Sequence, residues 1–240
     1  MTYHRIITDK EALEEFIEWL PDLDSHEAYL LHLQGRKKYA PELDLSDLTH
    51  LANTLCTKRD MISKIERMET KIGTYITKRG TVVPDHALTL YVTPNPRDLR
   101  KACVEGAKRF IDLATDPNKH NPRPDREILS VAHKCKSRSC YVHFDLDRPN
   151  PNDEAETPRD VTPIDVVYET VVNIVGSEAT TIVETRGGMH VLIEPKKVQS
   201  EIKNWHGAIL KHVNADQTGD MMLSVVGCNQ GGFTPRFYNV

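Results

Sequence analysis

Apolar and polar residues alternate along residues 141–147, which read Tyr-Val-His-Phe-Asp-Leu-Asp. Because successive side chains of a β-strand point to opposite faces, this pattern predicts a strand with one apolar and one polar face. Two carboxylates, Asp145 and Asp147, then stand side by side on the polar face. Carboxylates held that close repel each other unless a cation lies between them, and Mg²⁺ or Mn²⁺ is the usual partner.

Hydrophobic spacings of three and four residues predict helices along much of the chain, the first of them after a cap at Thr8-Asp9. Further helices are expected over residues 25–37, 45–56, 59–72, 98–113, 162–175 and 198–213. Strands are expected over residues 87–93, 139–147, 180–185, 189–194, 221–226 and 233–238. Prolines and polar residues predict loops at 116–126 and 148–163.

From residue 139 onward, the expected order is strand, helix, strand, strand, helix, strand. This is the order of a split βαβ sheet, as in ferredoxins and RNA-recognition motifs. We therefore expect an α/β (α+β) protein whose mostly antiparallel sheet has helices on one face and leaves the other face open for chemistry. A mostly helical N-terminal region, residues 1–84, is expected to pack on a larger region, residues 85–240, that carries this sheet.

Composition narrows the class of protein. The 240 residues are 39% hydrophobic and 28% charged, with no apolar run of transmembrane length and no signal-peptide pattern, which predicts a cytoplasmic protein that needs no membrane. The formal net charge is −4, so any binding of nucleic acid must use local basic segments. The basic segments are residues 36–39, 58–59, 97–101 and 134–138. Taken singly, each of them is more typical of a charged, solvent-exposed surface.

A hairpin is expected at Arg186-Gly187-Gly188, and it forms a second candidate element. Two glycines let a phosphate approach the backbone closely. On the following strand, His190 can donate to a triphosphate oxygen, and Arg186 can add a bidentate phosphate contact. Taken alone, the segment is more typical of an ordinary hairpin with a hydrogen-bonded histidine.

Residues 216–220, Asp-Gln-Thr-Gly-Asp, form a third candidate element. A carboxylate here would complete a two-metal site, in which cations activate a hydroxyl and stabilise a leaving pyrophosphate. Asp216 and Asp220 are rivals for that role, and their spacing does not decide between them. A plain polar turn is the alternative.

A zinc site is a further alternative, because His133, Cys135, Cys140 and His143 read His-x-Cys-x4-Cys-x2-His. The Cys-x4-Cys spacing is loose for a zinc knuckle, and His143 would have to leave the carboxylate face of its strand. Two reduced thiols beside a strand are the favoured interpretation.

In this order, the three candidate elements resemble the archaeo-eukaryotic primase superfamily, which includes the primase-polymerases. The resemblance covers roughly residues 85–238, and residues 91–97 are similar to an upstream strand and Asn-Pro turn of some members, including phage-encoded ones. Val226 stands where the family usually has proline after the third motif. The matching positions are Asp145 with Asp147, Gly188-Met189-His190, and Ala215-Asp216.

This resemblance implies a two-lobed catalytic core with an RNA-recognition-motif-like palm, and a DNA primase or DNA-directed polymerase that performs template-directed nucleotidyl transfer with Mg²⁺ or Mn²⁺ in DNA replication. It implies metal ligation by Asp145, Asp147 and Asp216 (or Asp220) and a contact of His190 with nucleotide phosphates. The implied partners are a single-stranded DNA template, nucleoside triphosphates and a separate replicative helicase, in the host cytoplasm for a phage-encoded protein. Weaker candidates for phosphate or template contacts are Arg186, Arg97 and Arg236, with Gly187 and Gly188 at the phosphate.

Two other functions stay open at this stage. A rolling-circle replication initiator nuclease uses a similar sheet with metal-binding histidines and a nucleophilic tyrosine, but the chain lacks a His-hydrophobic-His pair on a strand. A non-catalytic nucleic-acid-binding module with the same fold would bind no metal at the carboxylate strand.

Overall fold

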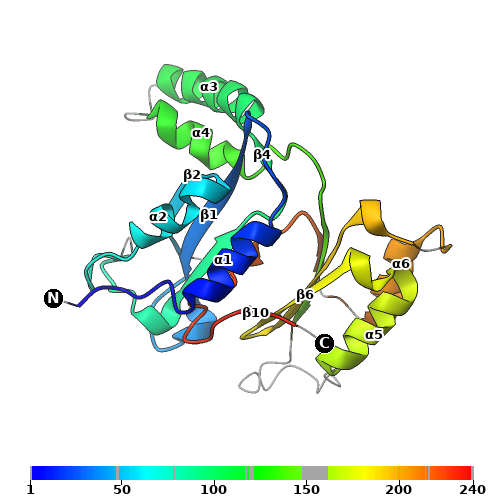
Figure 1. Ribbon diagram of the computed structural model, residues 1–240. Helices are drawn as coiled ribbons and strands as arrows, with labels where there is room; N and C mark the ends of the chain where they lie inside the picture. Colours follow the sequence, from blue (N-terminus) through cyan, green and yellow to red (C-terminus); the bar gives the residue numbers. More distant parts are fainter. Residues whose placement is uncertain are drawn as a thin grey trace.

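Two five-stranded antiparallel sheets form the framework of the protein (Figure 1). The structure is a computed structural model, and it describes residues 2–46, 49–77, 79–116, 118, 122–147, 162–199, 201–213, 215 and 217–238. The first sheet has the order β2 (Thr49–Cys56), β1 (Glu27–Gly35), β3 (Leu88–Val92), β9 (Leu223–Ser224), and β4 (Arg97–Asp98) also pairs with β1. The second has the order β10 (Arg236–Phe237), β6 (Thr180–Thr185), β7 (Gly188–Ile193), β5 (Val142–Asp147), β8 (Gln217–Gly219).

The second sheet carries helices on one face, as the sequence predicts. Along the chain, α5 (Ile164–Val175) follows β5 and α6 (Trp205–Val213) follows β7. Both helices lie on the same side of the sheet (Figure 1). The apolar alternates of β5, Phe144 and Leu146, are buried there with Val171 of α5 and Ile209 of α6. The strand therefore sits in the expected register, with its carboxylates on the opposite face.

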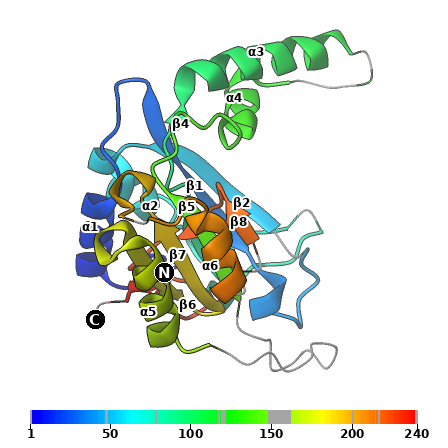
Figure 2. The ribbon, with the colours of Figure 1, turned by 90° about the vertical axis from the view of Figure 1, so that its right-hand side faces the viewer.

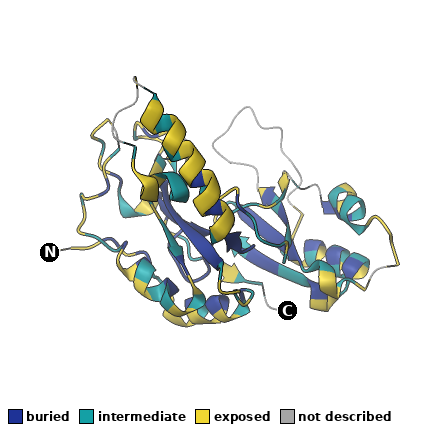
Figure 3. Ribbon diagram, turned by 90° about the horizontal axis from the view of Figure 1, so that it is seen from above, coloured by how far each residue is buried: buried dark blue, intermediate teal, exposed yellow. Residues whose placement is uncertain are grey.

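That opposite face is not left open, which corrects the prediction. Val183 and Leu192 also point to it, and both are buried in the core that contains Phe16 of α1 (Lys10–Trp19). The Tyr141 ring stacks on Trp19 at 4.7 Å between ring centroids. The second sheet has apolar side chains on both faces at this point. The first sheet and α1 pack against the face that carries Val183 and Leu192, and they exclude water from it. Buried positions accordingly follow the strands of both sheets (Figure 3).

Two of the helices expected near the N-terminus are strands. Residues 25–37 and 45–56 contain β1 and β2, and every residue of β1 is buried. A strand buried on both faces has no period-two pattern, so its apolar run imitates a helix. The helix after Thr8-Asp9 is confirmed as α1, since Asp9 accepts a hydrogen bond from the Ala12 amide at 3.1 Å. The helix expected over 59–72 shortens to α2 (Met61–Glu66).

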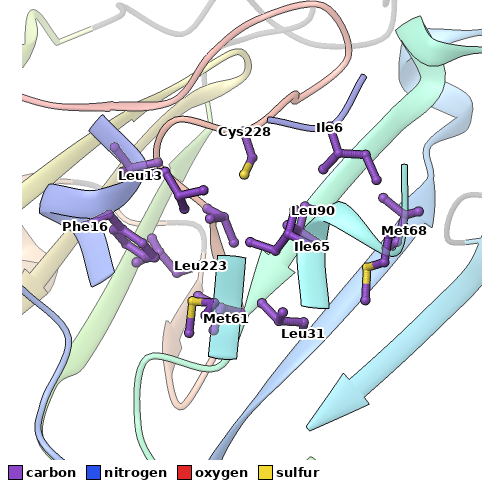
Figure 4. Packing of buried hydrophobic residues seen from close by; sticks show 14 of the residues in the cluster. Ile6, Leu13, Phe16, Leu31, Met61, Ile65, Met68, Leu90, Leu223 and Cys228 are labelled. Carbon is purple, nitrogen blue, oxygen red and sulfur yellow. The ribbon is translucent and has the colours of Figure 1, made fainter. Parts of the chain in front are cut away.

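Strands from distant parts of the sequence complete the first sheet. Its core brings Leu13 of α1 and Ile65 of α2 together with Leu31, Leu90 and Leu223 of β1, β3 and β9 (Figure 4). Since β9 lies between β8 and β10 in the sequence, the chain returns to the first sheet before its last strand joins the second. Among the helices of the described ranges, none has the length and apolar character needed to cross a membrane.

A helical hairpin projects from the first sheet (Figure 2). It consists of α3 (Leu99–Thr115), which confirms the helix expected over 98–113, and α4 (Pro124–Ala132), which begins inside the expected loop 116–126. A Cβ atom at Gly106 would lie 2.6 Å from the Ile128 Cα, so the glycine allows the two helices to approach closely. Ala102 of α3 is buried together with Ala132 of α4 and Leu30 of β1, whereas the neighbouring Cys103 is exposed.

Glu27, buried at the start of β1, holds the segment that leads into β5. Its two carboxylate oxygens accept from Nε and Nη2 of Arg138, each at 3.1 Å. Burial raises the pKa of this carboxyl, but hydrogen bonds from Arg138, the Asp24 amide and Ser137 outweigh it and lower the pKa to about 2. The folded chain therefore keeps Glu27 ionised at pH values where the unfolded chain has protonated it.

Glu27→Gln is expected to lower the free energy of unfolding by about 2 kcal/mol at pH 7. A depressed carboxyl pKa contributes stability above about pH 4.5, and this contribution is lost as the pH falls toward 2. The difference between variant and wild type should therefore shrink over that window in urea unfolding experiments. The exposed Glu14→Gln variant is the control, and an equal difference at pH 7 and pH 3 would contradict the assignment.

Candidate active site

The pairing of β5 with β7 brings together the first two candidate elements. Asp145 stands opposite His190, and Asp147 stands opposite Gly188. His190 Nδ1 lies 3.1 Å from Asp145 Oδ1. The Asp145 side chain is 24% exposed and that of Asp147 is 55% exposed, so both carboxylates can be reached from solvent. This register places a carboxylate pair beside a glycine turn and a histidine.

The third candidate element runs next to the same strand. Gln217 and Thr218 of β8 pair with Asp145 and Phe144 of β5. Asp216 itself lies outside the described residues, so its role stays a sequence-based prediction. The ladder shows that residues 217–219 form an edge strand beside the carboxylates. The sequence instead predicted the last strand of this sheet over residues 221–226, which contribute β9 to the first sheet.

Asp220, the rival third carboxylate, is engaged in a different contact. Its Oδ2 accepts from Arg97 Nη1 at 2.6 Å, and its Oδ1 accepts from Arg97 Nη2 at 3.1 Å and from Asn95 Nδ2 at 2.9 Å. Arg97 is only 1% exposed. The Asn95 Oδ1 in turn accepts from the amides of Cys140 and Tyr141 at the start of β5. Asp220 and Arg97 thus form a polar junction between the two sheets, in which Arg97 is buried and Asp220 is partly exposed.

The other two arginines have different partners. The guanidinium of Arg186 lies 4.4 Å from the centroid of the Tyr39 ring, and it donates to the Gly231 carbonyl. Arg236 instead pairs with Glu184 at 2.8 Å on the outer edge strand β10. The structure therefore brings Arg186 against Tyr39, close to the first sheet, and leaves Arg236 on the outer edge strand of the second sheet.

Basic and aromatic residues from the part of the chain that carries the first sheet face the carboxylates. Lys38 Nζ lies 3.8 Å from Asp147 Oδ1, and Arg36 Nη1 donates to the Tyr91 hydroxyl at 2.9 Å. Burial and the charges of Asp145 and Asp147 raise the pKa of Tyr91 despite the nearby Arg36. Residues 36–39 are visible in the sequence as a basic segment. Their position beside the carboxylates is not, because the contact between Lys38 and Asp147 joins residues more than one hundred positions apart.

No family model, curated protein or solved structure matches this chain.

The charge state of the site follows from its neighbours. Burial raises the pKa of Asp145, but the hydrogen bond and positive charge of His190, together with His143 and Lys38, outweigh it, and the net pKa is lowered. Beside them, His143 is fully buried, and its ring meets that of His190 edge-on at 4.6 Å. Burial lowers the pKa of His143 to about 3, so this ring is neutral at neutral pH. The site thus combines an ionised carboxylate at Asp145 with the neutral, buried ring of His143.

The carboxylate pair offers oxygen donors, which are the ligands that a hard divalent cation prefers. Mg²⁺ is usually held by one or two carboxylates together with substrate phosphates, and Asp145 and Asp147 are partly exposed oxygen donors on one strand face. Within the described ranges, no three His, Cys, Asp or Glu side chains are grouped as metal ligands. The zinc set of His133, Cys135, Cys140 and His143 is therefore not assembled, since His143 is buried beside His190 while His133 is exposed.

Gly188 is required by the closeness of the two strands at this turn. Its φ angle is 158°, and a Cβ atom there would lie 1.9 Å from the Leu146 carbonyl oxygen. At Gly187, by contrast, a Cβ atom would meet only the end of the Lys38 side chain at 3.0 Å and Asp147 Oδ1 at 3.3 Å. The space above Gly187 therefore opens toward the polar ends of the site.

Gly188→Ala is expected to lower the free energy of unfolding by more than about 1 kcal/mol, because the backbone must move away from Leu146. Gly187→Ala is the matched control and should change stability far less, since the tip of Lys38 can move. Urea unfolding of the two variants and the wild type measures the difference. Equal stability of both variants would contradict the close strand approach.

Proposed function

We propose that this chain is a DNA-dependent primase or primase-polymerase, which adds nucleotides to a growing strand on a single-stranded DNA template with Mg²⁺ or Mn²⁺. The observation that carries the proposal is the β5–β7 ladder, which sets Asp145 and Asp147 beside His190 and the Gly187-Gly188 turn. Lys38 stands across from this group. Carboxylates, a lysine and a glycine turn thus surround one partly exposed place. This combination suits a substrate that carries phosphates and a bound metal ion.

The topology of the second sheet supports the same proposal. Its chain order is strand, helix, strand, strand, helix, strand, and its spatial order is β8-β5-β7-β6. This is the arrangement of a split βαβ sheet, as an RNA-recognition-motif-like palm would have. The first sheet would then be the second lobe of a primase-type core, with the site between the lobes.

Each residue is assigned a role that its surroundings favour. Asp145 and Asp147, with Asp216 by resemblance, would hold the metal, which when bound activates the attacking hydroxyl and stabilises the leaving pyrophosphate. His190 keeps Asp145 ionised and oriented and faces the triphosphate. The open backbone at Gly187 admits a phosphate, and Lys38 and Arg186 add positive charge around it. We assign Arg97 and Asp220 to the junction between the sheets and not to the substrate.

Nucleotide incorporation on a defined single-stranded template tests this function. Purified protein is incubated with labelled ribonucleoside or deoxyribonucleoside triphosphates and Mg²⁺ or Mn²⁺, with and without a primer. We expect template-dependent products that EDTA abolishes. Absence of incorporation with every nucleotide and metal would reject the proposal, and a covalent 5′-phosphotyrosine adduct would favour the nuclease alternative.

A further inference from the structure

Two basic segments that are far apart in the sequence meet at the base of the α3–α4 hairpin. Arg97 and Lys136 form a backbone bridge, and the Asp98 amide donates a hydrogen bond to the Cys135 carbonyl at 2.7 Å. An open hollow of about 520 Å³ lies beside this pairing. The hollow is lined by Arg100, Lys101, Val104, Glu105, Lys134, Cys135 and Lys136.

The positive charge of this groove is largely uncompensated. Glu105 already pairs with Lys108 at 2.8 Å, and Lys101 pairs with Asp98 at 3.6 Å. In the described parts of the chain, Arg100, Lys134 and Lys136 have no carboxylate within ion-pair distance, although the whole protein carries a net charge of −4. Three free cations around one hollow in an acidic protein mark a local site for a polyanion.

The position of the groove relates it to the candidate active site. Lys136 lies nine residues before Asp145, so at most about 30 Å of extended chain separates them. Arg97 connects the two places directly, since its backbone bridges Lys136 and its side chain pairs with Asp220 at the end of β8. Val104 is 54% exposed at the groove and offers an apolar surface for an unstacked base.

We propose that this groove, Arg100 with Lys134 and Lys136, binds the phosphate backbone of single-stranded DNA on its way to the carboxylate site. The choice of single-stranded DNA over other polyanions rests on the proposed function. The charge argument itself does not depend on catalysis, so the two ideas can fail separately.

Binding of fluorescent oligothymidylate, about 20 nucleotides long, tests the groove in EDTA without nucleotides. Arg100→Gln/Lys134→Gln/Lys136→Gln should weaken binding at least tenfold at low salt. It should also reduce the slope of log affinity against log salt by about 2, because about 0.7 counterions are released per single-strand phosphate contact. Lys10→Gln/Lys71→Gln/Lys211→Gln removes the same charge from exposed positions elsewhere and should leave the slope unchanged.

The outcomes separate this inference from the proposed function. Asp145→Asn/Asp147→Asn should bind the oligonucleotide as the wild type does, whether or not the protein incorporates nucleotides. Should the triple variant fail to fold by circular dichroism, the single exposed variant Arg100→Glu serves the same test. Unchanged affinity and slope in the groove variants, equal losses in the control, or binding of anionic lipid vesicles but not of the oligonucleotide would overturn the inference.

Discussion

Asp145→Asn is expected to reduce nucleotide incorporation by at least about 100-fold while leaving the protein folded. The substitution keeps the shape of the side chain but removes the charge that His190 and Lys38 stabilise. A neutral amide is a weak ligand for a hard divalent cation and no longer neutralises it. Initial rates of template-dependent incorporation at saturating Mn²⁺ measure the effect.

Asp165→Asn is the matched control for this experiment. Asp165 is exposed on α5, on the face of the same sheet that points away from the site, and the substitution removes an equal charge. Its incorporation rate should stay at the wild-type value. Wild-type activity in the Asp145→Ala/Asp147→Ala double variant would remove the carboxylates from the mechanism and with them the proposed function.

The local pattern of apolar and polar residues was sufficient to predict the strand β5, which carries the carboxylates, and the neighbouring hairpin of β6 and β7. The alternation around Phe144 fixes which face is buried, and Gly187-Gly188 fixes the turn, so both features follow from neighbours in the sequence. The strand β1 was missed because a strand with neighbours on both sides and every residue buried carries no periodic signal. Only its pairing with β2 and β3 decides its conformation.

The contacts that join the two sheets could not be predicted from local sequence pattern, for a similar reason. Lys38 reaches Asp147, and Arg97 reaches Asp220, across more than one hundred residues of chain. A basic segment is visible in the sequence, but the carboxylate that it faces depends on how the sheets pack. Sequence alone therefore left Asp216 and Asp220 as equal rivals, whereas the structure shows that Asp220 already has a buried partner.

Asp220→Asn is expected to lower the free energy of unfolding by about 3 kcal/mol, because it leaves the guanidinium of Arg97 buried without a counter-charge. Removing one partner of a buried ion pair usually costs about 3–5 kcal/mol. We expect the lower value here, because the Asp220 side chain is 23% exposed. Urea unfolding at neutral pH measures the loss. Asp44→Asn breaks the exposed pair with Arg79 and should change stability little.

A double-mutant cycle with Arg97→Met shows whether the loss comes from the pair itself. The double variant should be clearly more stable than the sum of the single losses predicts, because it no longer buries a lone charge. Activity at low temperature then separates the two roles of Asp220. If it serves the junction, the folded Asp220→Asn protein keeps its incorporation rate, whereas a third metal carboxylate would lose activity as completely as Asp145→Asn without needing any loss of stability.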